Sequence, residues 1–467
     1  MAHRDARLVA LIEEARTRRY SRRQIIRRGL ALGLSMPAIG WILAACGGGE
    51  AAPTSAPGGG AAPGGTAAAS PGAGSPAAGG PAIKVGVVTS LSGDDVFGGN
   101  LTRRGYDFWA ETVNAQGGVE IGGQRYPVQM FYADDQSQPA TGADGAERLI
   151  TQDQVDVIFG PYTSGVTLAV APICDKYKVP MIAGSAESPN VWKAQPQYTF
   201  GIIPSVDLTA GKALQVILDQ ADPKPTSAAI LGADEPFSKE AAEGFLAGAR
   251  EAGLTITREE FFPPNADLTP LVSGVAATDP DIVAVGGHEE ILINFVRAAK
   301  SLNFAPKAII MHYGVTVPDF AANLGEDAEG VFGLVVWTPD VSYEDEVFGT
   351  AEEYFQAAQE RWGTAPDYTE AACSASGLVL ADALARLGTP PPYSEEDRVR
   401  LRDLLEETDI TTFYGPIRFE TEGDHFHDNT APTPVLVQIQ DGAVVAVGPS
   451  DAATAEMIYP LPAWNER

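Results

Sequence analysis

Short runs of β-branched residues alternate with longer stretches of helical periodicity from Ile83 onward. Apolar residues three or four apart indicate amphipathic helices, whereas short continuous apolar runs between turn residues indicate buried strands. Such alternation is typical of parallel sheets with right-handed crossovers. The first series predicts strands at 83–88, 128–132, 155–159 and 180–183, with helices at 100–114, 140–151 and 165–177.

The pattern then begins again in a second series. It predicts strands at 228–231, 255–261, 281–285 and 307–311, with helices at 239–252, 268–277 and 289–301. Near the end, the runs 435–439 and 443–447 flank Asp441-Gly442, a favoured hairpin-turn dipeptide. The two series predict an α/β fold with two Rossmann-like lobes built on parallel sheets. A ligand cleft is expected between them, at the loops that follow the strands.

The N-terminal segment does not follow this pattern. Ser21-Arg22-Arg23-Gln24-Ile25-Ile26-Arg27 resembles a twin-arginine export motif, and an uncharged apolar stretch follows from Gly29 to Ala45. That stretch is shorter than the roughly 20 residues that a membrane-spanning helix needs. It ends in Leu43-Ala44-Ala45-Cys46, which resembles a bacterial lipobox. We expect a signal peptide at 1–46 and lipidation of Cys46, with an uncleaved signal anchor as the alternative.

The next segment, 47–82, contains only Ala, Gly, Pro, Ser and Thr apart from Glu50. Such a composition buries too little apolar surface to offset the entropy of ordering. We expect a disordered linker that tethers a folded body to the outer face of the cytoplasmic membrane.

Charge and cysteine content narrow the possible partners. The chain has 32 basic and 61 acidic residues, for a net charge of −29. Because nucleic-acid phosphates are bound by Lys and Arg, this balance argues against nucleic acid as a partner.

Cys174 and Cys373 show no paired metal or redox spacing, and we expect both to be buried thiols in helices.

No enzyme motif stands out. The sequence has no nucleophile elbow around a Ser and no phosphate loop with Lys. His425 and His427, with Asp424 and Asp428, have metal-binding side chains, but nothing nearby completes a site, so we interpret them as a polar surface turn. We expect no enzyme activity, no cofactor and no metal. An exported hydrolase is the competing class.

Candidate binding residues follow the predicted strands. Ser164 lies at a helix start, where free N–H groups suit a carboxylate or carbonyl oxygen, and it is either a ligand contact or a cap. After the next strand, Glu187 either receives a ligand cation or amide or is a solvent-facing charge. In the second unit, Phe237 either covers a ligand or acts as a hydrophobic staple.

Further candidates lie at other strand-to-helix turns. Glu289 and Glu290 either hold an ammonium group or are ordinary acidic first-turn residues. Tyr313 and Trp337 are strand-end aromatics that we expect in the core or the cleft wall. Phe97, beyond the first strand, is a third aromatic candidate for ligand contact.

A series of short stretches runs through the body in a fixed order. They are Ile83-Lys84-Val85-Gly86-Val87, Leu91-Ser92-Gly93, Gly98, Arg104-Gly105, Val113-Asn114-Ala115-Gln116-Gly117-Gly118-Val119, Asp134-Asp135, Gly160-Pro161, Val170-Ala171-Pro172, Val179-Pro180-Met181-Ile182, Tyr198-Thr199-Phe200, Gly415-Pro416-Ile417-Arg418-Phe419 and Gly423-Asp424. Their order and spacing resemble the leucine/isoleucine/valine-binding protein family, the type I periplasmic binding proteins of ABC transporters. The resemblance covers nearly all of 83–450.

This resemblance implies two lobes joined by a three-crossover hinge that closes on a ligand. The first lobe is expected to hold 83–203 and about 314–430, and the second 204–313 and about 431–467. Each lobe then combines segments that are distant in the sequence.

The resemblance also implies roles for the candidate residues. Ser164 and Ser185 match positions whose hydroxyls hold a ligand carboxylate, whereas Glu187 stands where a Thr is common. Phe237 matches an aromatic offered by the second lobe, and the acidic group for a ligand amine falls near 289–290. Because Glu187 would repel a bound carboxylate, it argues against a plain α-amino acid. Because these loops hold few Lys or Arg, a dianionic ligand is disfavoured and a neutral, zwitterionic or cationic one is favoured.

We therefore predict an extracytoplasmic solute-binding lipoprotein of an ABC importer. It is expected to be a monomer that captures an amino acid, amide or related small molecule and delivers it to an ABC permease in the membrane. The alternative is a ligand-sensing subunit of a membrane signalling receptor with the same fold.

Overall fold

The computed structural model describes residues 80–450 and 452–466. The predicted signal peptide, the predicted lipidation site Cys46 and nearly all of the predicted linker lie outside these residues. Within the described part of the chain, no helix is both long enough and apolar enough to cross a membrane.

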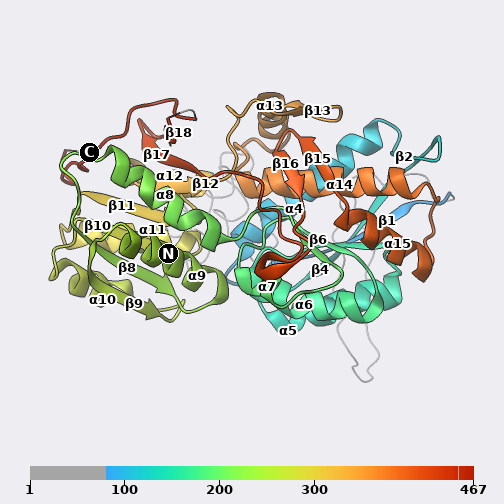
Figure 1. The fold of residues 1–467 in the computed structure, drawn as a ribbon, viewed down its shortest axis with the longest axis horizontal. Helices are drawn as coiled ribbons and strands as arrows, with labels where there is room; N and C mark the ends of the chain where they lie inside the picture. The colour runs from blue at the N-terminus through green and yellow to red at the C-terminus, as the bar shows by residue number, and fades with distance from the viewer. Residues whose placement is uncertain (1–79, 451, 467) are drawn as a thin grey trace, which may run out of the picture. The chain divides into compact units, whose positions relative to one another are not determined.

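A five-stranded parallel sheet forms the centre of the first lobe (Figure 1). In spatial order its strands are β4 (Val128–Asp134), β1 (Ile83–Thr89), β5 (Val157–Phe159), β6 (Met181–Ala183) and β7 (Thr199–Gly201). Side chains alternate between the faces of a sheet, so Val87 packs in one hydrophobic cluster and Val88 in another. β1 is largely apolar because both faces are covered.

Helices cover both faces of the first sheet. α4 (Val96–Ala115) packs with α14 (Tyr368–Leu387) on one face, and α5 (Pro139–Arg148) packs with α6 (Ser164–Tyr177) on the other. α5 continues into a π-helical turn, Leu149–Asp153. Other helices of the first lobe are α7 (Pro189–Lys193), α13 (Ala351–Trp362) and α15 (Glu395–Glu406).

α4 begins at Val96, before the predicted start at residue 100. Two glycines in its first turn, Gly98 and Gly99, weaken the helical signal because glycine is a poor helix former. Close packing explains both: a Cβ on Gly98 would overlap the ring of Tyr162, and one on Gly99 would overlap the carbonyl of Ser90.

A seven-stranded sheet forms the centre of the second lobe (Figure 1). In spatial order its strands are β18 (Ala443–Gly448), β17 (Val435–Gln440), β12 (Phe332–Val335), β11 (Ala308–His312), β10 (Ile282–Gly286), β8 (Ser227–Ala233) and β9 (Thr255–Phe262). The strands from β12 to β9 are parallel, whereas β17 and β18 form the predicted hairpin and pair antiparallel. The α/β fold with parallel-strand sheets in two lobes is therefore confirmed.

β12 follows the predicted lobe boundary near 314, in the segment that was assigned to the first lobe. It pairs in parallel with β11 and antiparallel with β17, so 332–335 belong to the second sheet. The assignment of about 314–430 to the first lobe therefore differs from the structure at β12. The run Phe332-Gly333-Leu334-Val335 is short and contains a Gly, so the apolar pattern alone did not mark it as a strand.

Helices also cover both faces of the second sheet. α8 (Val206–Gln220) and α9 (Pro236–Glu251) pack on one face. α10 (Leu268–Ala276), α11 (Glu289–Ser301) and α12 (Pro318–Leu324) pack on the other. The described residues also form three short antiparallel pairs: β2 (Val119–Ile121) with β3 (Gln124–Tyr126), β13 (Glu344–Asp345) with β14 (Gly349–Thr350), and β15 (Asp409–Thr412) with β16 (Gly415–Arg418).

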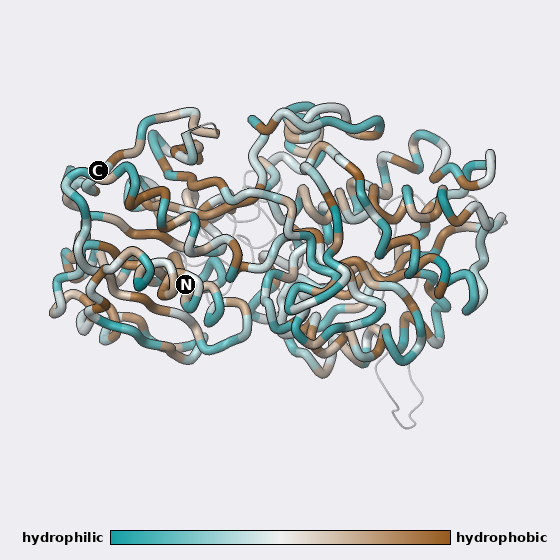
Figure 2. Tube along the Cα trace, viewed as in Figure 1, coloured by the Kyte–Doolittle hydropathy of each residue, from teal (hydrophilic) through white to brown (hydrophobic). Residues whose placement is uncertain are grey.

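Hydrophobic residues concentrate on the sheet strands, and hydrophilic residues on the outer turns (Figure 2). Cys174 in α6 and Cys373 in α14 are both buried and free. This confirms the prediction of buried thiols in helices. Burial raises the pKa of each thiol, which keeps it protonated and unreactive.

Three crossovers connect the lobes, one after β7, one after β12 and one before β17. The first and third are hydrogen-bonded to each other: Gly201 N–H donates to the His427 carbonyl at 2.9 Å, and Asn429 N–H donates to the Gly201 carbonyl at 3.1 Å. The Ser205 hydroxyl also donates to Asp428 Oδ2 at 2.6 Å. These two crossovers therefore form one connected strap.

The segment interpreted as a polar surface turn is mostly interior. His427 and Asp428 are fully buried, and the His427 ring stacks on Phe200 with centroids 4.2 Å apart. The surface interpretation was wrong because the segment carries the third crossover, which runs beside β7.

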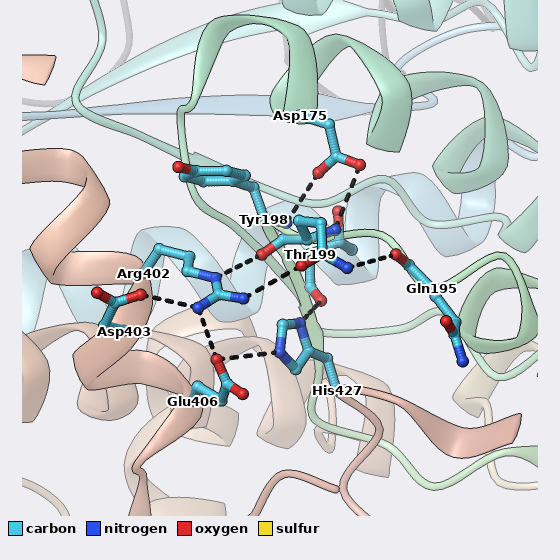
Figure 3. Close-up of polar contacts among 9 residues, drawn as sticks. Asp175, Gln195, Tyr198, Thr199, Arg402, Asp403, Glu406 and His427 are labelled. Carbon is cyan, nitrogen blue, oxygen red and sulfur yellow. Dashed lines mark hydrogen bonds and ion pairs between the residues drawn. The ribbon is translucent and has the colours of Figure 1, made fainter. Parts of the chain in front are cut away.

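His427 lies in a polar cluster between β7 and α15 (Figure 3). Its Nδ1–H donates to the Thr199 carbonyl at 3.2 Å, while Nε2 lies 3.8 Å from Glu406 Oε2. Arg402 binds the same Glu406 oxygen at 2.7 Å and Asp403 Oδ1 at 2.7 Å. Burial and then the Arg402 charge lower the pKa of His427 to about 3.

We expect this histidine to make the protein acid-sensitive. The unfolded chain takes up the His427 proton near the ordinary value of 6.5, whereas the folded protein takes it up only near pH 3. Between these values the unfolded state binds more protons, so stability falls as pH drops below about 6.5. The slope from this one group approaches about 1.4 kcal/mol per pH unit. His427→Asn keeps an N–H for Thr199 but cannot titrate, so urea unfolding across this range should show a shallower slope. An unchanged slope would contradict the assignment.

Candidate functional site

A small cavity lies where strand-end loops of the two lobes meet. Its volume is about 10 Å³, room for roughly one water molecule. The residues that line it are Tyr162, Ser164, Ser185, Glu187, Phe237, His288, Tyr313 and Thr369. The lobes are therefore closed around their own side chains.

The strand order brings these residues together. Tyr162 and Ser164 follow β5, and Ser185 and Glu187 follow β6, in the first lobe. In the second lobe, the lining residues follow β8, β10 and β11. The carboxyl ends of parallel strands lie at one edge of each sheet, so both lobes present their loops to the same space.

The two serine hydroxyls hold first-lobe loops in place. Ser164 Oγ accepts hydrogen bonds from the backbone N–H groups of Glu187 and Ser188, at 3.2 and 3.1 Å. Ser185 Oγ donates to the Pro161 carbonyl at 3.0 Å. The helix cap of α6 is Thr163, whose side chain accepts from Val166 N–H, so Ser164 is not the cap.

Glu187 is buried and pairs with the second lobe. Its Oε2 lies 2.9 Å from His312 Nε2, and its Oε1 accepts from the Tyr368 hydroxyl at 2.8 Å. His312 ends β11 in the second lobe, whereas Tyr368 begins α14 in the first. The structure therefore excludes the reading of Glu187 as a solvent-facing charge.

Both ring nitrogens of His312 have polar partners. His312 Nδ1 lies 3.1 Å from the Leu334 carbonyl, and Nε2 lies 2.9 Å from Glu187 Oε2. The imidazole therefore bridges the end of β12 to the first-lobe carboxylate when the lobes are closed.

A second contact between the lobes centres on Glu289. Its Oε1 accepts from Gly98 N–H at 3.2 Å and its Oε2 from the Tyr162 hydroxyl at 3.1 Å. Burial raises the pKa of Glu289. His288 Nδ1 lies 3.0 Å from the same hydroxyl. Burial opposes protonation of His288, but the nearby carboxylates, that of Glu235 first, outweigh burial and raise its pKa.

Aromatic rings from both lobes enclose the cavity. The His288 ring lies 5.2 Å from both Tyr162 and Phe237, measured between centroids. The His312 ring lies 5.4 Å from Phe237 and is stacked on Tyr368 at 6.3 Å. These rings give the cleft apolar walls with a few polar atoms between them, as is typical of small-molecule sites.

Some of the predicted site residues line the cavity and others lie away from it. Ser164, Ser185, Glu187, Phe237 and Tyr313 all line the cavity, and Glu289 lies behind Tyr162. Phe97 is half-buried against the core, and Glu290 is exposed on α11; neither lines the cavity. Trp337 is buried and donates to the Phe413 carbonyl. Ligand contact by any of these residues stays a prediction.

Five residues of this region were missed as candidates. Tyr162 and His288 lie in the strand-to-helix turns already singled out, so their position was a usable signal. No such position marked His312, because it is the last residue of an otherwise apolar strand. Tyr368 and Thr369 begin α14, which reaches the cleft only through the second crossover, so no local pattern marks them.

A larger hollow of about 410 Å³ opens beside the first and third crossovers. Its lining includes Lys212, Glu422 and His425, but none of the predicted site residues. We consider the smaller cavity the candidate site, because strand-end loops of both lobes converge on it.

The sequence matches the model of the periplasmic binding protein family over residues 82–443. The chain belongs to this family. The match confirms the resemblance that the sequence motifs indicated.

Relatives support the same membership. This periplasmic binding protein is 25% identical to a Leu/Ile/Val-binding protein homolog of Brucella melitensis, over 81% of this chain and 93% of that protein. Its fold is similar to the branched-chain amino acid binding protein LivJ of Streptococcus pneumoniae in complex with isoleucine, with 22% identity, a TM-score of 0.66, and coverage of 81% and 100%.

A third relative has a different kind of ligand. It is a solute-binding protein of an ABC transporter from Rhodopseudomonas palustris, in complex with 3,4-dihydroxybenzoic acid. It shares 19% identity and a TM-score of 0.67, with 80% of this chain and 98% of that chain covered. The fold therefore does not determine which solute is bound.

Removal of the Tyr162 hydroxyl should loosen closure. Tyr162→Phe leaves the buried Glu289 carboxylate and His288 without this partner, which costs about 1–3 kcal/mol in the closed form. We expect X-ray scattering of the ligand-free variant to give a larger radius of gyration than that of the unmodified protein.

Tyr368→Phe is the matched control, because it removes a hydroxyl that bonds Glu187 within the first lobe. Its radius of gyration should stay close to that of the unmodified protein. Equal values for both variants would contradict a closing role for Tyr162.

Proposed function

We propose that this periplasmic binding protein is the solute-binding component of an ABC importer. In this role it captures an amino acid, amide or related small molecule between its lobes. The closed cleft supports the proposal: strand-end loops of both lobes converge on one cavity lined by aromatic rings and a few polar groups.

Capture requires the lobes to separate first. A cavity of about 10 Å³ cannot hold an amino acid, so a ligand enters an open form and replaces some of the polar contacts between the lobes. The three crossovers provide the hinge for this motion. In the ligand-bound form, Ser164, Ser185, Glu187, Phe237 and Tyr313 are the proposed contacts.

The family and the fold are those of solute-binding proteins, not of enzymes. We infer that the solute is released chemically unchanged. A bound compound recovered intact after prolonged incubation supports binding, whereas its hydrolysis would favour the exported-hydrolase alternative.

Periplasmic binding proteins act outside the cytoplasm. We propose that this one is a monomer held at the outer face of the cytoplasmic membrane by a lipid on Cys46. The lipobox-like stretch before Cys46 and the Ala/Gly/Pro/Ser linker after it support this attachment. A tether lets the lobes reach a permease in the same membrane.

Solute binding should raise the melting temperature, because a ligand stabilises the native state by mass action, by about 2.7 kcal/mol at 100 times its Kd. A thermal-shift panel of amino acids, amides, polyamines and aromatic acids tests this. Phe237→Ala should abolish the shift given by the best compound.

The control variant is Phe304→Ala, which truncates a half-buried ring of the second lobe that does not line the cavity. Each variant is compared with its own ligand-free melting temperature, so lost core packing does not affect the result. An equal ligand-induced shift in both variants would remove Phe237 from the site.

Cys46→Ala should release the protein from the membrane fraction, because it removes the acyl attachment point. Cys174→Ala, at a buried cysteine of α6, should leave membrane association unchanged. If the Cys46 variant stays in the membrane fraction, an uncleaved signal anchor explains attachment and the lipid anchor is rejected.

A further inference from the structure

Acidic groups outnumber basic groups around the cleft. Glu187, Glu289 and Asp367 each place a buried carboxylate beside it, and Asp95 and Glu235 lie near His288. The basic groups near these carboxylates are His312 beside Glu187, His288 beside Glu235, and Arg104 near Asp367. Of residues 80–450 and 452–466, no Lys or Arg lines the cavity. The cleft therefore favours positive charge.

Three of the donors that would receive a ligand carboxylate already have partners. The N–H groups of Glu187 and Ser188 both donate to Ser164 Oγ. The Ser185 hydroxyl donates to the Pro161 carbonyl. A carboxylate at this position would have to break these bonds and lie beside Glu187.

The aromatic walls suit a cation as well. Tyr162, Phe237, Tyr313 and Tyr368 surround the two imidazoles, and ring faces attract positive groups, with the largest effect where water is excluded. Each of these rings is buried. A carboxylate within such rings is a favourable environment for an ammonium group.

Resting on the function proposed above, we infer that the solute is a small organic cation without a carboxylate. Its positive group lies between Glu187 and the aromatic rings. His312 fills this place in the closed structure: its ring stacks on Tyr368 and its Nε2 faces Glu187.

Opening of the lobes exposes this position. His312 moves with β11 in the second lobe, while Glu187 and Tyr368 stay together in the first. Glu187 then lacks its second-lobe partner. A ligand ammonium takes the place of that partner and allows the lobes to close again on the ligand.

A series of compounds with one shape and different charge tests the inference. Leucine is the zwitterion, its decarboxylated amine the cation, the corresponding alcohol the neutral member and the deaminated acid the anion. Choline and its uncharged carbon isostere form a second pair. Binding of each to the purified full-length protein is measured by calorimetry.

We expect the cation to bind at least about ten-fold more tightly than the neutral member in one of the two series, about 1.4 kcal/mol, and the anion not to bind. Glu187→Gln should remove that preference. Glu243→Gln, which neutralises an exposed carboxylate on α9, is the control and should keep it.

Other results would overturn the inference. They are tighter binding of leucine or the acid than of the amine, equal binding of cation and neutral member, or no saturable binding of either cation. Tight leucine or acid binding rejects the cation while leaving the solute-binding function in place. If the broad thermal-shift panel also gives no ligand, the solute-binding function itself is rejected.

Discussion

A carboxylate that is buried between two lobes needs hydrogen-bond donors to replace the water it loses, and the opposite lobe can supply them. The closed structure meets this requirement repeatedly: Glu187 faces His312, Glu289 accepts from Tyr162, and Asp367 accepts from Tyr313 at 2.5 Å. Each pair joins a first-lobe residue to a second-lobe residue. An unpaired buried charge is strongly destabilising, so loss of one partner favours separation of the lobes. Closure therefore depends on a set of matched polar contacts.

The same requirement links binding to motion. A ligand that enters the cleft displaces donors from the buried carboxylates and must replace them, or the lobes cannot close. Selectivity then comes from the groups left unpaired by a wrong ligand, because their desolvation is not compensated. The relatives with isoleucine and with 3,4-dihydroxybenzoic acid share this fold with different solutes, so strand-end side chains are expected to set the selectivity.

Strand and helix alternation predicted the two-lobed fold because both faces of each sheet are covered, which makes the central strands largely apolar. The expectation that ligands bind at the loops after parallel strands also selected Ser164, Ser185, Glu187, Phe237 and Tyr313. All five line one cavity. That expectation could not anticipate partners reached through crossovers, such as Tyr368 on α14. Nor could it show that His427 and Asp428 are interior, because their burial follows from the path of the third crossover. Local patterns identify elements, whereas contacts between distant segments decide which polar groups meet.

The paired crossovers limit how the lobes can move. Gly201, His427 and Asn429 exchange backbone hydrogen bonds, and the Asn429 side chain also donates to the Ile202 carbonyl at 3.0 Å. Sliding one crossover past the other would break all of these bonds, whereas bending both together preserves them. Three covalent connections therefore act mechanically as two. Relative translation of the lobes is suppressed and rotation about one axis remains, so each opening returns the cleft residues to the same register.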